Sequence, residues 1–441
     1  MKIFYVLFIL ILFQNCSFDN KTGIWNNDLE SPIEKNNQFK DFKKLSTTQE
    51  FFDKIIPINK KIQIKLPSQT YPKKWTDIFY NRNNNYDNFQ YDNLNKIIFR
   101  SKKLSRYQID KYILYENNNL IFNDKKGNVV SYSLKEKKIL SKFNFYKKSY
   151  KKFEKELNFI VENRVIYISD NLGYLYAYDY KKNKLIWAKN YKIPFNSNFK
   201  IFKDYLFTSN INNNFIILEK ETGNILKQIP TEEILVQNDF KNNLSQNNES
   251  ILFLNTFGTL YSIDNKKFNI KWFVNLNPSI DLNTSNLFNS NQIVNNNNLV
   301  IVTTNKFTYV IDAINGSIIY KLNLTSFIKP LITNNYLFLV SDNELLISFD
   351  LINGKIIYSY DINEEISVFL NTKKKKAHFK FFTMSNDNLM IFLKSSYILK
   401  FDVRGNLKDI YKLPSKMSSN PIFINGNILY LDNKKKLITL N

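Results

Sequence analysis

The chain has 441 residues, 44% of them hydrophobic, so it can bury a large core, and radially repeated all-β folds reach this length as one domain. A formal net charge of +23 raises nucleic acid or an acidic surface as partners. The lysines are, however, scattered through expected turns and strand edges, where they discourage aggregation, and this argues against a nucleic-acid-binding protein. The densest run, Lys373–Lys376, is expected in a solvated loop.

The N-terminus has the pattern of a secretory signal. A short basic start precedes an apolar run of about eleven residues, Ile3–Phe13, which is too short to cross a bilayer as a helix. Cys16 is the only cysteine, and it lies where a bacterial lipoprotein signal places its acylated residue. Gln14 and Asn15 replace the small residues usual before that cysteine. We predict a lipoprotein signal over residues 1–16 with lipidation at Cys16; the alternative is a plain secretory signal.

The next segment, residues 17–60, is polar and lacks sustained periodicity, so we expect a flexible tether. Ser17, rather than Asp, follows the cysteine, which by analogy with such lipoproteins favours the outer membrane. With one cysteine the chain has no intramolecular disulfide.

An internal repeat begins after the tether and predicts the fold. Each copy reads as a strand, a tight turn, a strand ending in an acid, a second turn, and a strand with an aromatic residue eight positions after the acid. Eight copies occur at intervals of about 38 to 52 residues. The clearest copies contain the pairs Asp179 and Trp187, Asp264 and Trp272, Asp312 and Tyr320, and Asp350 and Tyr358.

The residue types of the repeat suit a propeller blade. Strands such as Tyr174–Tyr178 are apolar on both faces, as expected of a small sheet packed between two neighbours. The acid and the Asn or Gly that follow it form a tight turn, and the Trp or Tyr fills the gap between wedge-shaped blades. We therefore predict an all-β, eight-bladed β-propeller of four-stranded antiparallel blades over residues 61–441, the alternative being an open solenoid.

The eighth copy is short of one strand, and an N-terminal strand is expected to complete it. Lys61–Leu66 is the candidate, because its alternating pattern suits a strand. Such closure would leave no free sheet edge in the ring.

The segment Gly173–Asp179 followed by Lys184–Trp187 resembles the PQQ-type propeller repeat. Two families share it: quinoprotein dehydrogenases, and the BamB family of lipoproteins in the β-barrel assembly machinery (BAM complex) of the outer membrane. Size, eight copies, the signal and the lone cysteine make the chain resemble the BamB family. That resemblance implies a non-catalytic scaffold on the periplasmic face of the outer membrane. It would act as a monomer within a complex and bind the POTRA domains of BamA to aid insertion of barrel proteins.

The resemblance also implies where the partner binds. Family contacts lie in one loop before the fourth blade and in another between the fourth and fifth blades. The matching residues here are Ile234, Leu235 and Val236, and Asp281 and Asn283. The family's Arg is absent from the first loop, and Asn283 replaces an acid in the second. The alternative for Ile234–Val236 is an ordinary blade strand.

Enzymatic chemistry finds little support in the residues. Quinoprotein dehydrogenases typically add a vicinal cysteine pair and a Ca²⁺ site, and one cysteine cannot make the pair. His378 is the only histidine, so no histidine cluster for zinc exists, and no phosphate-binding glycine motif is present. We expect no catalytic residue, metal or cofactor. A PQQ-dependent dehydrogenase and a surface adhesin or carbohydrate-binding propeller remain the alternatives.

Overall fold

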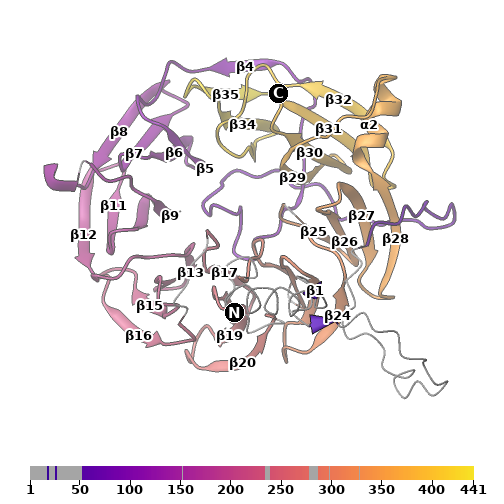
Figure 1. Cartoon of the computed structure of the whole chain (residues 1–441). Coiled ribbons are helices and arrows are strands. Elements are labelled where there is room, and N and C mark those ends of the chain that lie inside the picture. The colour runs from indigo at the N-terminus through magenta and orange to yellow at the C-terminus, as the bar shows by residue number, and fades with distance from the viewer. Residues whose placement is uncertain are drawn as a thin grey trace, which may run out of the picture. The chain divides into compact units, whose positions relative to one another are not determined.

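The computed structural model describes residues 52–150, 152–233, 239–277, 287–296, 298–326 and 328–441, with a short strand pair nearer the N-terminus. That pair joins β1 (Ser17–Phe18) and β2 (Trp25–Asn26). Residues 51–441 form one compact unit, and residues 1–50 are separate from it. Over the described part of residues 51–441, eight sheets lie around one axis (Figure 1). Seven have four strands, and one has a fifth, short strand at its inner edge. The predicted eight-bladed, antiparallel β-propeller is confirmed, and the solenoid alternative is wrong.

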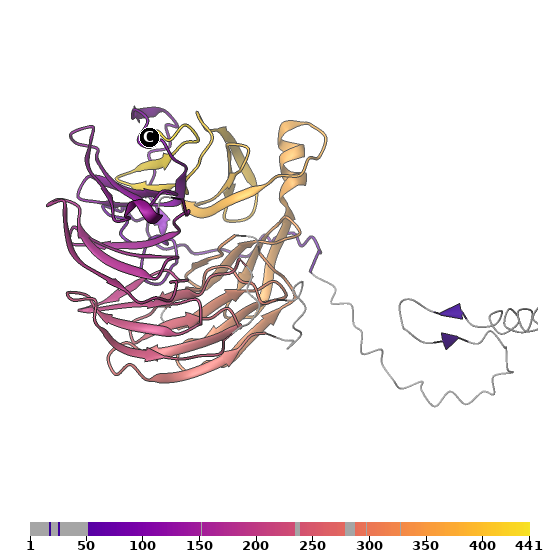
Figure 2. The same cartoon turned by 60° about the vertical axis from the view of Figure 1, so that its left-hand side comes forward.

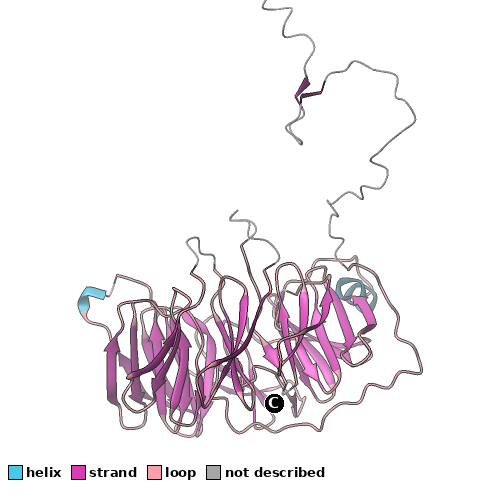
Figure 3. Cartoon of the chain, turned by 90° about the horizontal axis from the view of Figure 1, so that it is seen from below, coloured by secondary structure: helices cyan, strands magenta, loops and turns pink. Residues whose placement is uncertain are grey.

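Each blade places its first strand at the axis and its last strand at the rim (Figure 1). The inner strands of neighbouring blades contact one another, as β13 does with β17 and β17 with β21. The strands of all blades run across the ring from one face to the other (Figure 3). One face therefore carries every connection between consecutive blades, and we call it the inter-blade face.

The first four blades take their strands in chain order. The first has β5 (Ile109–Glu116), β6 (Asn119–Asp124), β7 (Asn128–Ser133) and β8 (Lys138–Asn144), followed by the 3-10 turn η1 (Lys148–Tyr150). The second has β9 (Leu157–Glu162), β10 (Val165–Asp170), β11 (Tyr174–Asp179) and β12 (Lys184–Asn190). The third has β13 (Lys200–Phe202), β14 (Tyr205–Ser209), β15 (Phe215–Glu219) and β16 (Ile225–Ile229). The fourth has β17 (Asn243–Gln246), β18 (Ser250–Leu254), β19 (Thr259–Asp264) and β20 (Ile270–Asn275).

The last four blades add a helix and strands from the N-terminal side. The fifth has β21 (Val294–Asn295), β22 (Leu299–Thr303), β23 (Thr308–Asp312) and β24 (Ile318–Leu322). The sixth has β25 (Leu331–Thr333), β26 (Tyr336–Val340), β27 (Leu345–Asp350) and β28 (Lys355–Asp361), followed by helix α2 (Ile362–Leu370). The seventh has β29 (Phe379–Ser385), β30 (Asn388–Leu393), β31 (Tyr397–Asp402) and β32 (Leu407–Lys412), with β3 (Asn88–Phe89) parallel to β29. The eighth has β33 (Ile422–Ile424), β34 (Asn427–Leu431), β35 (Leu437–Leu440) and β4 (Ile97–Arg100).

The recurring acid holds the turn between the third and fourth strands. In the second blade Asp179 accepts hydrogen bonds from the backbone N–H groups of Lys181 and Lys182, at 2.9 and 2.8 Å. Asp264, Asp312 and Asp350 accept the same pair of bonds in their own blades. These carboxylates replace backbone partners that a tight turn lacks, which is a structural task.

The recurring aromatic residue locks one blade to the next. Trp272 of the fourth blade donates its indole N–H to the carbonyl of Ala313 in the fifth, at 3.2 Å. Its ring also covers Gly316, where an added Cβ would lie 2.6 Å from a ring carbon. Trp187 covers Gly223, Tyr320 covers Gly354, and Tyr358 with Tyr360 covers Gly405 in the same way. The glycine of each turn thus makes room for the aromatic plate of the preceding blade.

The strand that completes the eighth blade is β4, which pairs antiparallel with β35. The prediction of Lys61–Leu66 for this place is wrong. That segment has no strand; it belongs to residues 52–70, which run over the edge of the sixth and seventh blades. Ile56 bonds to Ser359 of β28, and the carbonyl of Ile62 accepts from Arg404. The alternation of this segment instead places Ile62 and Ile64 half-buried against the core.

Gly316→Ala tests the lock between blades. Gly316 has φ +79°, so alanine adds backbone strain, and its Cβ collides with Trp272. We expect a loss of about 2–4 kcal/mol in the free energy of unfolding, measured by chemical denaturation. In a Trp272→Leu background, where the ring is gone, the same change should lose about 1 kcal/mol. Equal losses in both backgrounds would contradict the lock.

Candidate protein-binding face and plugged axis

Residues 71–92 fill the axis of the propeller, and we call them the plug. In Figure 1 this indigo segment crosses the centre of the ring. Trp75 is 1% exposed and Asn84 is fully buried. The plug therefore separates the openings of the axis on the two faces.

The plug hydrogen-bonds to every blade, at its inner strand or directly after it. In seven blades these bonds satisfy backbone groups on the free edge of the sheet at the axis, and in the third the bond is to the Lys200 side chain. The contacts in blade order are Trp75 with Tyr115, Thr76 with Val161, Asp77 with Lys200, Arg82 with Gln246, Asn83 with Asn295, Asn85 with Ile332, Phe89 with Ser385, and Pro72 with Asn425.

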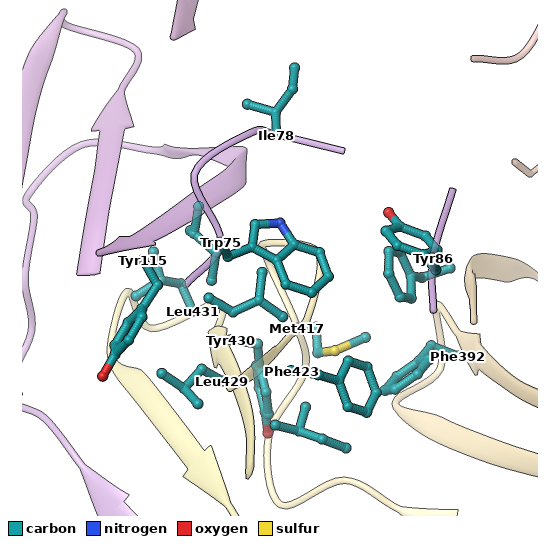
Figure 4. Packing of buried hydrophobic residues seen from close by; sticks show 14 of the residues in the cluster. Trp75, Ile78, Tyr86, Tyr115, Phe392, Met417, Phe423, Leu429, Tyr430 and Leu431 are labelled. Carbon is teal, nitrogen blue, oxygen red and sulfur yellow. The ribbon is translucent and has the colours of Figure 1, made fainter. Parts of the chain in front are cut away.

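Aromatic rings of the plug join it to the core of the eighth and seventh blades. Figure 4 shows Trp75 beside Leu431 and Met417, and Tyr86 near Phe392. Phe89 stacks on Phe423 with ring centroids 5.0 Å apart. The plug is consequently part of the hydrophobic core as well as of the hydrogen-bond network.

A buried ion pair fastens the plug to the third blade. The Lys200 ammonium lies 2.6 Å from the Asp77 carboxylate, with side chains 1% and 7% exposed. It also donates to the side-chain oxygen of Asn84 at 2.5 Å. Burial lowers the pKa of Lys200, and the nearby Asp77 opposes that shift. A buried charge of this kind is tolerated only while its partner is present.

A second buried lysine reaches the plug from the sixth blade. Lys329 donates to the carbonyl of Asn84, and its ammonium lies 3.2 Å from the centre of the Tyr86 ring. Burial and the neighbouring Lys200 hold the pKa of Lys329 well below its usual range. Lys200 and Lys329 thus both lie near Asp77 at the axis, and Lys200 is the one that forms an ion pair with it.

Two cavities open above the plug on the inter-blade face. One, of about 530 Å³, is lined by Phe79 and Tyr86 of the plug, by one acid, Glu344, and by five lysines: Lys111, Lys329, Lys376, Lys380 and Lys394. The other, of about 650 Å³, shares Phe79 and Lys111 but balances its lysines with Asp110, Glu156 and Asp239. The centre of this face is therefore concave, partly apolar and cationic on one side.

The described flanks of the two predicted binding loops lie side by side on the inter-blade face. Phe240, after the first loop, and Phe288, after the second, pack edge to face with ring centroids 5.6 Å apart. Before the first loop, Glu232 accepts hydrogen bonds from Asn255 and Tyr261 of the fourth blade. The flanks are thus fixed next to one another at the fourth blade.

The predicted contact residues themselves, Ile234, Leu235, Val236, Asp281 and Asn283, lie outside the described residues, as does Cys16. Lys373–Lys376 lie on an exposed loop after α2, as expected.

Sequence reasoning missed the plug. Abundant Asn and Lys suggested solvated surface, yet Asn83, Asn84 and Asn85 bond to inner strands at the axis. The available signal was Trp75, a tryptophan in a segment outside the repeat.

Comparison with known proteins shows the fold. No protein-family model matches the chain, and no curated protein matches its sequence. Among solved structures it is similar to BamB from Moraxella catarrhalis, with TM-score 0.62 and 11% identity over 78% of this chain and 99% of that one. It is also similar to quinohemoprotein alcohol dehydrogenase from Comamonas testosteroni, with TM-score 0.58 and 9% identity over 83% and 80%. The computationally designed Ika8 protein matches with TM-score 0.58 and 9% identity over 78% and 99%.

The described residues do not provide the metal site that the dehydrogenase resemblance implies. The plug's own aromatic rings and amides occupy the axis. No group of three or more His, Cys, Asp or Glu side chains in the described residues is arranged to hold a metal. No helix among them is long and apolar enough to span a membrane.

Asp77→Asn tests the buried ion pair. It leaves the Lys200 ammonium buried without its counter-ion, so we expect a loss of about 3–5 kcal/mol in unfolding free energy. Adding Lys200→Met should recover part of that loss, because no unpaired charge remains. A double variant as unstable as the sum of the two single variants would contradict the pairing.

The pH dependence of stability tests the environment of Lys380. Burial, with Lys416 and Lys394 nearby, lowers the pKa of Lys380 to about 8. Above that pH the unfolded chain holds a proton that the folded one has lost, until about pH 10.4. Stability of the parent relative to Lys380→Met should therefore rise between these pH values, by about 1–2 kcal/mol after solvent screening. The check is chemical denaturation of both proteins across this range, and a difference independent of pH would contradict it.

Proposed function

We propose that this protein is a non-catalytic scaffold lipoprotein of the BAM complex, held at the periplasmic face of the outer membrane through Cys16. It binds the POTRA domains of BamA with its inter-blade face and helps barrel proteins insert. The observation that carries the scaffold part is the plug: the axis is occupied by the chain itself, which leaves loops on a rigid frame as the means of recognition.

The comparisons support the BAM part of the proposal. The similarity extends over 99% of BamB, 99% of the designed Ika8 protein and 80% of the alcohol dehydrogenase, so it is compatible with a BamB-like body without selecting it. The signal-like start with Cys16 adds independent support, because a lipid-anchored periplasmic scaffold needs such a start.

The geometry of the inter-blade face supports the location of the binding site. Phe240 and Phe288 hold the flanks of the two loops together, beside a cavity lined by Asp239 and Phe240. A partner that contacts both loops would thus meet one continuous surface.

Co-purification from solubilised outer membranes tests the proposal. The tagged parent chain should recover BamA. Leu235→Asp combined with Asp281→Arg should lower recovery of BamA at least about tenfold. The first change puts a charge where an apolar contact is expected, and the second reverses the charge of an expected acidic contact. The matched control is Lys182→Glu with Lys266→Glu, in turns on the opposite face, with thermal unfolding measured for all variants. Absence of BamA with the parent chain would refute the BAM assignment; equal loss in the control would refute the face.

A further inference from the structure

Helix α2 exposes three apolar side chains at its C-terminal end. Val368, Phe369 and Leu370 are 71%, 45% and 50% exposed. The helix packs on the propeller nearer its start, through Ile362 and Asn363, and through Ser367, which are buried. Figure 2 shows the orange helix at the edge of the ring, standing clear of the strands. The apolar residues thus form a convex tip with no protein cover among the described residues.

The tip is followed directly by four exposed lysines, Lys373–Lys376. Lys374 pairs with Asp361 at 2.5 Å, and Lys376 pairs with Glu344 at 2.7 Å. Lys373 and Lys375 have no ion pair with a described residue. The surface therefore combines an apolar tip with two uncompensated positive charges, which we call the apolar–basic tip: Val368–Leu370, Lys373 and Lys375.

The chain enters the propeller beside this helix. Phe52 donates its backbone N–H to Asn323 at 2.8 Å, and its carbonyl accepts from the side chain of Asn343 at 3.3 Å. The residue after Asn343, Glu344, holds the start of α2 through Asn363 and through the backbone N–H of Ile362. The N-terminal segment that carries Cys16 thus joins the body within a few residues of the helix base.

We propose that the apolar–basic tip binds the surface of a membrane that contains anionic phospholipids. Val368, Phe369 and Leu370 enter the interfacial region, and Lys373 and Lys375 contact headgroup phosphates. This surface goes beyond the proposed BamA binding, and rests on the proposed anchoring only for its place in the cell. Residues 17–51, fully extended, could span at most about 120 Å. With so long a connection, a lipid at Cys16 does not by itself fix the orientation of the propeller relative to the membrane. A second contact with the membrane, beside residue 52, would fix that orientation.

The chemistry favours a membrane over a protein partner. The apolar residues form a projecting tip and not a groove, and a tip suits insertion between headgroups. Lysine is depleted from protein interfaces, because its ammonium is strongly hydrated, whereas it keeps that hydration beside lipid phosphates. Glu365, the acid of the helix that has no ion pair with a described residue, lies in the first turn and away from the tip.

Vesicle binding by the full chain with Cys16→Ser tests the proposal, because no acyl chain then contributes. The protein should sediment with vesicles of 30% phosphatidylglycerol in phosphatidylcholine, and much less with phosphatidylcholine alone. Lys373→Glu with Lys375→Glu should weaken binding at least about tenfold, and so should 0.5 M salt. Val368→Ser, Phe369→Ser and Leu370→Ser together should weaken it to a similar degree.

The matched control is Ile314→Ser with Ile352→Ser, two turn residues that are 70% and 64% exposed on the opposite face. It should bind vesicles as the parent does. Phe369→Trp adds a direct readout: the fluorescence of the introduced indole should shift to the blue with anionic vesicles. Thermal unfolding must match the parent for each variant.

Binding that is unaffected by both tip variants, absence of binding, or an unshifted emission from the Phe369→Trp variant would overturn the proposal. Recovery of BamA is measured separately, so failure of the membrane contact and failure of the BAM assignment remain distinguishable. A variant that loses BamA but keeps vesicle binding supports two separate surfaces. A tip variant that loses BamA and keeps vesicle binding would instead assign the tip to the protein partner and overturn the membrane contact.

Discussion

The free inner edges of the blades are the constraint on which this propeller depends. A four-stranded sheet that meets its neighbours only by side chains leaves backbone N–H and C=O groups unpaired at the axis. The plug supplies partners to such groups in seven of the blades and bonds to the Lys200 side chain in the third. One Asn amide can serve two blades, as Asn84 does toward Leu244 and Ile293. Because each inner strand bonds to the same short segment, movement of one blade disturbs the others. The ring is stiffened from its centre.

The repeat could be read from the sequence because its physics is local. The acid and the aromatic residue eight positions later can both be recognised within one copy of the repeat. Asp312 accepts a hydrogen bond from the backbone of its own turn, and Tyr320 donates to the carbonyl of Ile352 in the next blade. The closing strand could not be read in the same way. Ile97–Arg100 and Lys61–Leu66 both suit a strand, and their choice depends on register with β35, a contact distant in sequence.

The plug and helix α2 could not be predicted from the sequence, because both depend on tertiary contacts. Asn84 and Lys200 have the composition of solvated surface, and only the ring geometry makes them buried partners. Helix α2 is nine residues long inside a strand-rich chain, held by Asp361 at its N-cap and by tertiary contacts. The binding residues proposed from family resemblance lie outside the described residues, so their flanks, Phe240 and Phe288, carry the structural argument.

The similarity to BamB, to dehydrogenases and to a designed propeller at comparable TM-scores shows that this frame is compatible with very different tasks. In this chain the axis is filled by its own aromatic rings, while the inter-blade face keeps its concave, partly cationic centre. Recognition by that face requires no chemistry at the axis.

The pairing of β4 with β35 has a consequence for how the chain reaches its native state. β4 leaves the ribosome long before its partner, so the eighth blade is assembled from two segments at the extremes of the propeller. The contacts within the eighth blade therefore join residues far apart in the sequence. The entropy of closing this long loop is lost before packing of the blade can stabilise it. Until then, β4 offers an unpaired edge to any other extended chain nearby. A longer interval between synthesis of β4 and of β35 therefore means a longer exposure of that edge.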